Sequence, residues 1–130
     1  MIKILTLALG GAFGTLSRYY ISELVNSANS HQIPFGTIAV NLIGSFVIGA
    51  LWALLEGFQI GENYRIFLFT GILGGFTTFS AFALETMNLM NQGSVKYAIY
   101  NVLITNVTGL LLVALGYYSI KYLLKVFTKQ

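Results

Sequence analysis

The residues best suited to chemistry lie around an interruption in an otherwise apolar segment. An uncharged run extends from Ile66 to Leu84, and its middle reads GILGGFTTFSAF at residues 71–82. Three glycines and two adjacent threonines weaken helical preference there, although the run is long enough to cross a bilayer. Broken backbone at membrane depth is tolerated where it is buried in protein or faces water. The pattern therefore predicts an ion site or substrate pathway, with close helix packing on small residues as the alternative.

Two further features near this segment could handle a small anion. Asn41 precedes Ser45 by one helical turn in an apolar stretch, and its amide can donate two hydrogen bonds without carrying charge. Hydrogen bonding between helices is the alternative role. Phe79 and Phe82 share a helical face, and the positive edges of their rings could solvate an anion without trapping it. Ordinary packing against lipid or core is the alternative for the two rings.

Other polar residues interrupt the apolar segments. Arg18 lies well inside the first one, where it either reaches back to the interface or marks the mouth of an anion path. Glu23 and Glu85 fall near segment ends and are expected to be solvated. The last segment has a polar face, formed by Asn101, Thr105 and Thr108 with Asn106 adjacent. This face is polar enough to line a cavity or a pathway.

Composition places this chain in the membrane. Of its 130 residues, 56% are hydrophobic and 8% are charged, whereas a soluble domain has about 25% charged residues. Cysteine is absent, and one histidine with four acidic residues leaves no room for a catalytic triad, a carboxylate dyad or a zinc site. An enzyme is not expected. The net charge of +3 comes from lysines near the ends, which indicates membrane-flanking charge and no nucleic-acid partner.

Four segments approach the roughly 20 apolar residues that a membrane helix needs. They are Ile2–Val25, Phe35–Glu56, Arg65–Met90 and Tyr97–Tyr122, joined by polar connections at Asn26–Ile33, Gly57–Asn63 and Asn91–Lys96. The prediction is an all-α membrane protein, a single domain over residues 1–130, with four transmembrane helices and the third broken in the membrane. Four helices can hardly enclose a polar pathway, so oligomerisation is expected. The spacings Gly10/Gly14 and Ser45/Gly49 would support it.

Three motifs, in this order along nearly the whole chain, resemble the Fluc-type fluoride channels, also called the CrcB family. The first is GGAFG at residues 10–14, followed by Arg18-Tyr19. The second is Gly36-Thr37, then VNLIGSF at residues 40–46 and on to Gly49. The third, GGFTTFSAF at residues 74–82, is highly specific.

The resemblance implies a fluoride-selective channel in the plasma membrane, crossing it several times and exporting fluoride passively from the cytoplasm. It also implies an antiparallel, dual-topology dimer with two narrow pores. The second subunit would be either identical or a homologous paralogue. A structural Na⁺ ion would lie at the centre of the dimer.

Site residues carry over by motif position. Phe79, Phe82 and the Ser80 between them would line the pore with Asn41, and Arg18 would lie in the vestibule. The broken third helix would offer the backbone carbonyls of Gly74 and Thr77 to sodium, a hard cation that prefers oxygen ligands. Two departures affect the pore: Ala81 stands where threonine is common, and the family's fourth-helix tyrosine and serine fall at Asn101 and Thr105.

Two other functions remain open at this level. A small four-helix exporter of the multidrug-resistance type also forms antiparallel dimers, but it relies on a carboxylate deep in its first helix. Here the first segment has only Glu23, near its end. A membrane subunit that merely packs would leave Asn41, the Gly-Thr interruption and the polar fourth segment unexplained.

Positive charges predict the orientation. With four spans, one side would hold five basic residues and the other two: Lys3, Arg65, Lys121, Lys125 and Lys129 against Lys96 and Arg18. Because an excess of lysine and arginine marks the cytoplasmic side, both termini are expected inside. This bias favours a chain that inserts mostly one way and pairs with a homologous subunit of opposite bias. A dual-topology homodimer is the alternative.

Overall fold

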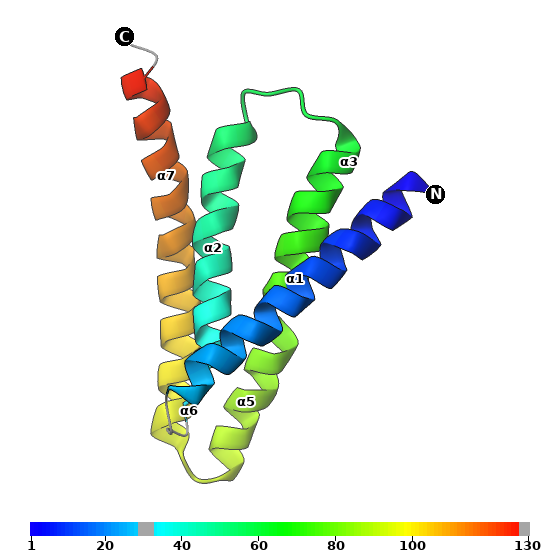
Figure 1. The fold of residues 1–130 in the computed structure, drawn as a ribbon. Coiled ribbons are helices and arrows are strands. Elements are labelled where there is room, and N and C mark those ends of the chain that lie inside the picture. Colours follow the sequence, from blue (N-terminus) through cyan, green and yellow to red (C-terminus); the bar gives the residue numbers. More distant parts are fainter. Residues whose placement is uncertain (29–32, 128–130) are drawn as a thin grey trace.

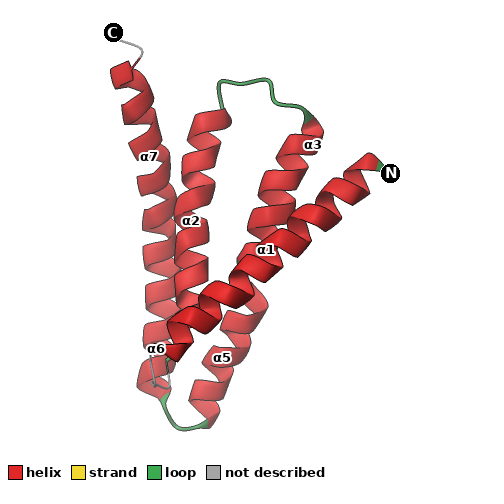
Figure 2. Cartoon of the chain, in the orientation of Figure 1, coloured by secondary structure: helices red, strands yellow, loops and turns green. Residues whose placement is uncertain are grey.

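The structure is a computed structural model that describes residues 1–28 and 33–127, and regular structure within these ranges is entirely helical (Figures 1 and 2). The first two long helices are α1 (Ile2–Ser27) and α2 (Phe35–Leu55). The third long segment comprises α3 (Glu62–Arg65), η1 (Ile66–Leu73), α4 (Gly74–Phe76) and α5 (Phe79–Asn91). The fourth comprises α6 (Val95–Leu103), η2 (Ile104–Thr108) and α7 (Gly109–Phe127).

Helix length and composition confirm an all-helical chain suited to a membrane. Among the described residues, three helical segments are long and apolar enough to cross one: Phe35–Leu55, Glu62–Asn91 and Val95–Phe127. The remaining long helix, α1, is less apolar because it carries Lys3, Arg18 and Glu23. Its 26 residues would extend about 39 Å, which exceeds the roughly 30 Å hydrocarbon core.

Small residues bring the helices together within the chain. Helix α1 crosses the third segment, and α2 runs beside α7 (Figure 1). A Cβ added to Gly10 would come within 2.7 Å of the Phe67 carbonyl oxygen, so only glycine allows this approach of α1 to η1. A Cβ added to Gly49 of α2 would come still closer to the Val113 carbonyl oxygen of α7. These glycines thus pack inside one chain, and their expected role in oligomerisation stays a prediction.

Segment boundaries differ from the predicted ones at polar residues. Helix α1 continues through Ser27, and the Asn26 side chain accepts a hydrogen bond from the Gly36 amide at 2.9 Å. Between them, residues 29–32 of the predicted connection lie outside the described residues. The last connection is only residues 92–94, where Gly93 adopts a φ of 75° that favours glycine. Helix α6 therefore begins at Val95, two residues before the predicted start.

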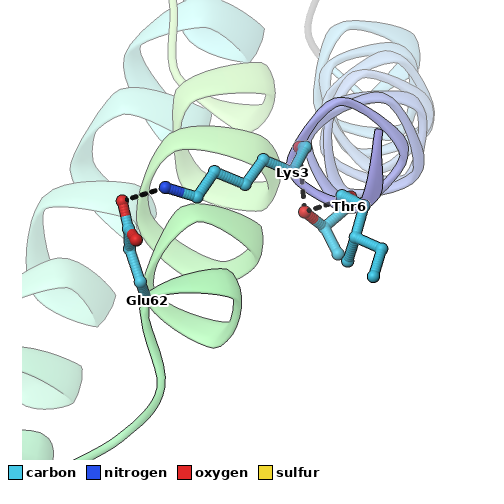
Figure 3. A network of polar contacts seen from close by, with 4 residues as sticks. Lys3, Thr6 and Glu62 are labelled. Atoms are coloured by element: carbon cyan, nitrogen blue, oxygen red, sulfur yellow. Dashed lines mark hydrogen bonds and ion pairs between the residues drawn. The ribbon is translucent and has the colours of Figure 1, made fainter.

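Two ion pairs lie at the end of the molecule that holds the N-terminus and the α2–α3 connection (Figure 1). Lys3 Nζ lies 2.7 Å from Glu62 Oε1, which ties α1 to α3 (Figure 3). Lys121 Nζ lies 2.6 Å from Glu56 Oε2, which also accepts a hydrogen bond from the Tyr117 hydroxyl. These two contacts, with Lys121 the larger, hold the pKa of the Glu56 carboxyl below its ordinary value. Both ion pairs are exposed, so each adds little stability.

Candidate functional site

The third segment changes direction at Thr77 and Thr78. Their backbones are extended, with φ/ψ of −87°/156° and −149°/121°, between the short helix α4 and α5. Thr78 is the N-cap of α5, and its side-chain oxygen accepts a hydrogen bond from the Ala81 amide at 3.3 Å. Threonine is favoured at such a cap because it satisfies an amide that has no partner in the first helical turn. The two threonines therefore end one helix and start the next.

Asn41 holds this extended backbone from the neighbouring helix α2. Its Nδ2 donates to the Thr78 carbonyl at 3.0 Å, and its Oδ1 accepts from the Thr78 amide at 2.8 Å. The amide side chain thus pairs with Thr78 much as a neighbouring strand would. One Nδ2 hydrogen remains beyond these two bonds. Asn41 consequently joins two helices and still keeps a donor.

Two of the amides at the break have partners other than the carbonyls that they would meet in a continuous helix. The Thr78 amide would donate to the Gly74 carbonyl, but here it donates to Asn41. The Ala81 amide would donate to the Thr77 carbonyl, but here it donates to the Thr78 side chain. Gly74 and Thr77 are the two residues predicted to offer carbonyls to a cation. Both of their carbonyl oxygens are released from the helical pattern.

Two cavities meet at Thr78. One, of about 340 Å³, is lined by most of the predicted pore and cation residues: Asn41, Gly74, Thr77, Phe79, Phe82 and Thr105. The other, of about 450 Å³, is lined by Arg18, Ser22, Thr37 and Ser80 among others. Thr78 borders both cavities, and its hydroxyl lies 3.5 Å from that of Ser80. The structure therefore places Arg18 and Ser80 at the second cavity, next to the first cavity, which holds Phe79 and Phe82.

The two phenylalanines have different surroundings. Their ring centroids are 5.5 Å apart and their planes are tilted by 52°. Phe82 is 6% exposed, whereas Phe79 is 76% exposed on the surface of this single chain. Both rings line the same cavity, so the buried Phe82 forms its inner wall and the exposed Phe79 its outer wall.

The fourth segment supplies one residue to this cavity and keeps another away from it. Thr105, in η2, lines the cavity, as does the neighbouring Asn106. Asn101 is completely buried and lines neither cavity. Its Nδ2 donates to the Thr86 hydroxyl oxygen at 2.8 Å, and its Oδ1 accepts from the Thr105 hydroxyl at 3.4 Å. Thr105 thus faces the cavity while Asn101 lies behind it.

Sequence reasoning missed a pair of residues next to the second cavity. Glu85 was expected to be solvated, but this is wrong: its Oε1 accepts a 2.7 Å hydrogen bond from the Thr37 hydroxyl, and its Oε2 is buried without a described partner. Glu85 lies only two turns after the break, on the α5 face that turns toward α2. Its position in an apolar segment was the available signal, since intramembrane carboxylates are rare and usually functional.

Comparison with known proteins agrees with these features. Residues 5–117 match the family model described as CrcB-like protein, Camphor Resistance (CrcB). A protein of Parabacteroides distasonis named fluoride-specific ion channel FluC is 48% identical over 116 residues, covering 89% of this chain and 91% of the relative. Proteins of the same name from Salinibacter ruber and Desulfotalea psychrophila are 46% and 42% identical, covering 89% and 96% of this chain and 87% and 98% of the relatives. This chain therefore belongs to the CrcB family.

Proposed function

We propose that this chain is a fluoride-selective channel that lets fluoride leave the cytoplasm passively. The observation that carries the proposal is the pair of cavities meeting at Thr78, lined by hydroxyl and amide donors and two phenylalanine rings. Its relatives are named fluoride-specific ion channels, a class that is not enzymatic. A passive path for an anion requires only uncharged or weakly attractive groups, so that each ion binds and leaves.

The residues have separate tasks along this path. Arg18 attracts the anion into the second cavity, which Ser80 and Thr78 also line. The remaining Asn41 hydrogen and the positive ring edges of Phe79 and Phe82 then replace part of the hydration shell. No lysine or arginine is among the described residues that line the cavity of Phe79 and Phe82, so an ion that binds there can also leave.

The chain is a multi-pass membrane protein, which in a bacterium means the plasma membrane. We infer that α1 is a fourth span beside the three apolar segments. Its exposed side includes Leu9, Phe13 and Leu16, which suit contact with lipid tails. The third segment, Glu62–Asn91, places Thr77 and Thr78 near its middle. The break then falls at membrane depth, where its backbone requires protein partners such as Asn41.

A second subunit would complete the pathway. Phe79, Ser80 and Asn106 border the cavities and are exposed in the single chain. Polar side chains facing lipid at this depth are costly, so a protein surface should cover them. An antiparallel copy or a homologous subunit of opposite orientation fits this need, with two pores per dimer.

The released carbonyls fit a sodium ion. Sodium is held well by neutral backbone oxygens, and Gly74 is exposed beside the cavity, where a partner subunit could add its own oxygens. Among the described residues, no cluster of histidine, cysteine or acidic side chains could hold a metal instead. Gly74 and Thr77 would hold the ion, and its charge would stabilise the broken third segments of the two subunits where they meet.

Ion efflux from liposomes containing the purified protein tests this function. Fluoride should leave far faster than chloride, without a proton gradient, because the donors and ring edges suit a small anion. Equal rates for the two anions would remove the channel assignment. Fluoride release that occurs only with a proton gradient would favour the exporter alternative.

A further inference from the structure

The buried amide of Asn101 lies at the centre of a hydrogen-bonded chain that ends at a pore phenylalanine. Asn101 Nδ2 donates to the Thr86 hydroxyl at 2.8 Å, and that hydroxyl donates to the Phe82 carbonyl at 2.8 Å. Because the single hydroxyl hydrogen of Thr86 is used for Phe82, its lone pair faces Asn101. The directions of both bonds are thus determined, and they connect α6 to the turn of α5 that begins at Phe82.

Within the single chain, polar links of this kind hold helix α5, since little of the helix is packed. Of its 13 residues, only Phe82 and Leu89 are buried. Among the described residues, side-chain hydrogen bonds tie the body and cap of α5 to other helices at three places. Asn41 holds Thr78 from α2, Thr37 binds Glu85 from α2, and Asn101 binds Thr86 from α6. The last of these connects α5 to the fourth long segment.

We propose that Asn101 is a positioning residue for the pore, acting through Thr86 on Phe82 without contacting the ion. Asn101 is 0% exposed and borders neither cavity, whereas Phe82 lines the cavity that Asn41 also lines. The bond to Thr86 fixes the turn of α5 that sets the direction of the Phe82 ring. Deleting the bond lets this turn move and misaligns the ring edge. This inference rests on the proposed function, because it assigns a role within the same pathway.

Asn101 also controls the hydroxyl of Thr105, which lies on the cavity. Thr105 has one hydroxyl hydrogen, and it points toward Asn101 Oδ1 at 3.4 Å. At that length the bond is weak, so a passing anion can take the hydrogen while the 2.8 Å bond to Thr86 stays in place. Asn101 therefore keeps α5 in position even when Thr105 turns to the ion.

Substitutions at Thr86 test the link with the least change in shape. Thr86→Val removes the hydroxyl and keeps the volume, Thr86→Ser keeps the hydroxyl, and Asn101→Leu removes the amide. Fluoride efflux is measured from liposomes that hold at most one channel each. The fraction of fluoride released then counts active channels, and the time course gives the rate of each. We expect Thr86→Val and Asn101→Leu to slow each channel about fivefold, with the active fraction unchanged. This is the factor by which the net free energy of one hydrogen bond shifts an equilibrium between an aligned and a misaligned turn.

Controls separate positioning from stability. Thr86→Ser should restore most of the rate, and the double variant Thr86→Val/Asn101→Leu should be no slower than either single one. Thr6→Val provides a matched control, because Thr6 also bonds back to its own helix but lies on α1, away from both cavities. A lower active fraction with an unchanged rate per channel would show that the link only stabilises the fold, and would overturn the proposal.

Amide hydrogen exchange gives a readout that does not depend on fluoride. The segment Phe79–Asn91 should exchange faster in Thr86→Val and Asn101→Leu than in the parent and in Thr86→Ser. If the parent conducts fluoride but exchange and efflux are unaltered in both variants, Asn101 has no positioning role. If the parent does not conduct fluoride, the proposed function fails, whereas the exchange comparison still decides whether Asn101 holds α5.

Discussion

Replacing Asn41 by aspartate changes very few atoms at the break and should stop fluoride flow. Aspartate can still accept the hydrogen bond from the Thr78 amide, now 2.8 Å from Oδ1. It cannot donate to the Thr78 carbonyl, to which the Asn41 Nδ2 of the parent donates at 3.0 Å. An oxygen would face an oxygen, and the loss of this bond costs about 1–3 kcal/mol.

The added charge has the larger effect on conduction. Asn41 lines the same cavity as Phe79 and Phe82, so a fluoride ion there would pass close to the new carboxylate. At a separation of about 4 Å and an effective dielectric constant of about 20, the repulsion is about 4 kcal/mol. This corresponds to about a thousandfold loss of fluoride occupancy in the cavity. We therefore expect efflux from liposomes to fall to the background of protein-free vesicles.

The assay needs a check on assembly and a matched substitution. The Asn41→Asp protein should elute from gel filtration like the parent, because one of its two bonds to Thr78 remains. Asn63→Asp makes the same chemical change in α3, outside both cavities, and should conduct normally. If Asn41→Asp conducts within twofold of the parent, Asn41 does not border the ion path and the reasoning fails.

Four other predictions follow from the site and from the ends of the molecule. Phe82→Ile keeps bulk but removes the positive ring edge, so efflux should fall at least about tenfold while the protein still assembles. Efflux at the rate of the parent would show that the ring only packs against its neighbours. A crystal of the dimer should show an ion bound by the Thr77 carbonyls, and a water or empty density there would contradict the sodium assignment. Because the pKa of Glu56 is lowered in the folded state, its pairing with Lys121 stabilises the fold above pH 4.5 and is lost as pH falls below that value. Thermal melting of Glu56→Gln should therefore vary less across this acid range than melting of the parent, and an identical pH dependence would be the contrary result. Cysteine placed at position 130 should be labelled mainly from the cytoplasmic side of intact cells, whereas comparable labelling from both faces would exclude a fixed orientation.

The helices could be predicted closely from apolar length, and their ends less well. An apolar run measures the thickness of the hydrocarbon core, but a helix continues into polar residues where water satisfies its backbone. The fourth segment shows this, since it extends from Val95 to Phe127 instead of from Tyr97 to Tyr122. The side chain of Asn26, expected in a connection, belongs to α1 for the same reason.

The candidate site was predictable in its residue types but not in its pairings. Glycine and threonine content pointed to the region around Thr77, because local preference for helix is weak there. That Asn41 would pair with Thr78, or Thr37 with Glu85, depends on how distant helices pack, which no local pattern contains. The small-residue spacings are limited in a related way: they predict a close approach without saying whether the partner helix belongs to the same chain.

The pairing of Asn41 with Thr78 also bears on how the protein is made. All the hydrogen bonds described at the break are made between residues that fall within 41–81. Asn41 leaves the ribosome before Thr78, and both precede the helices α6 to α7. When the third segment enters the bilayer, the amide that must receive its extended backbone is already in the membrane. The order of synthesis thus matches the order in which these bonds can form, and the nascent chain can complete the break before its last span enters the bilayer.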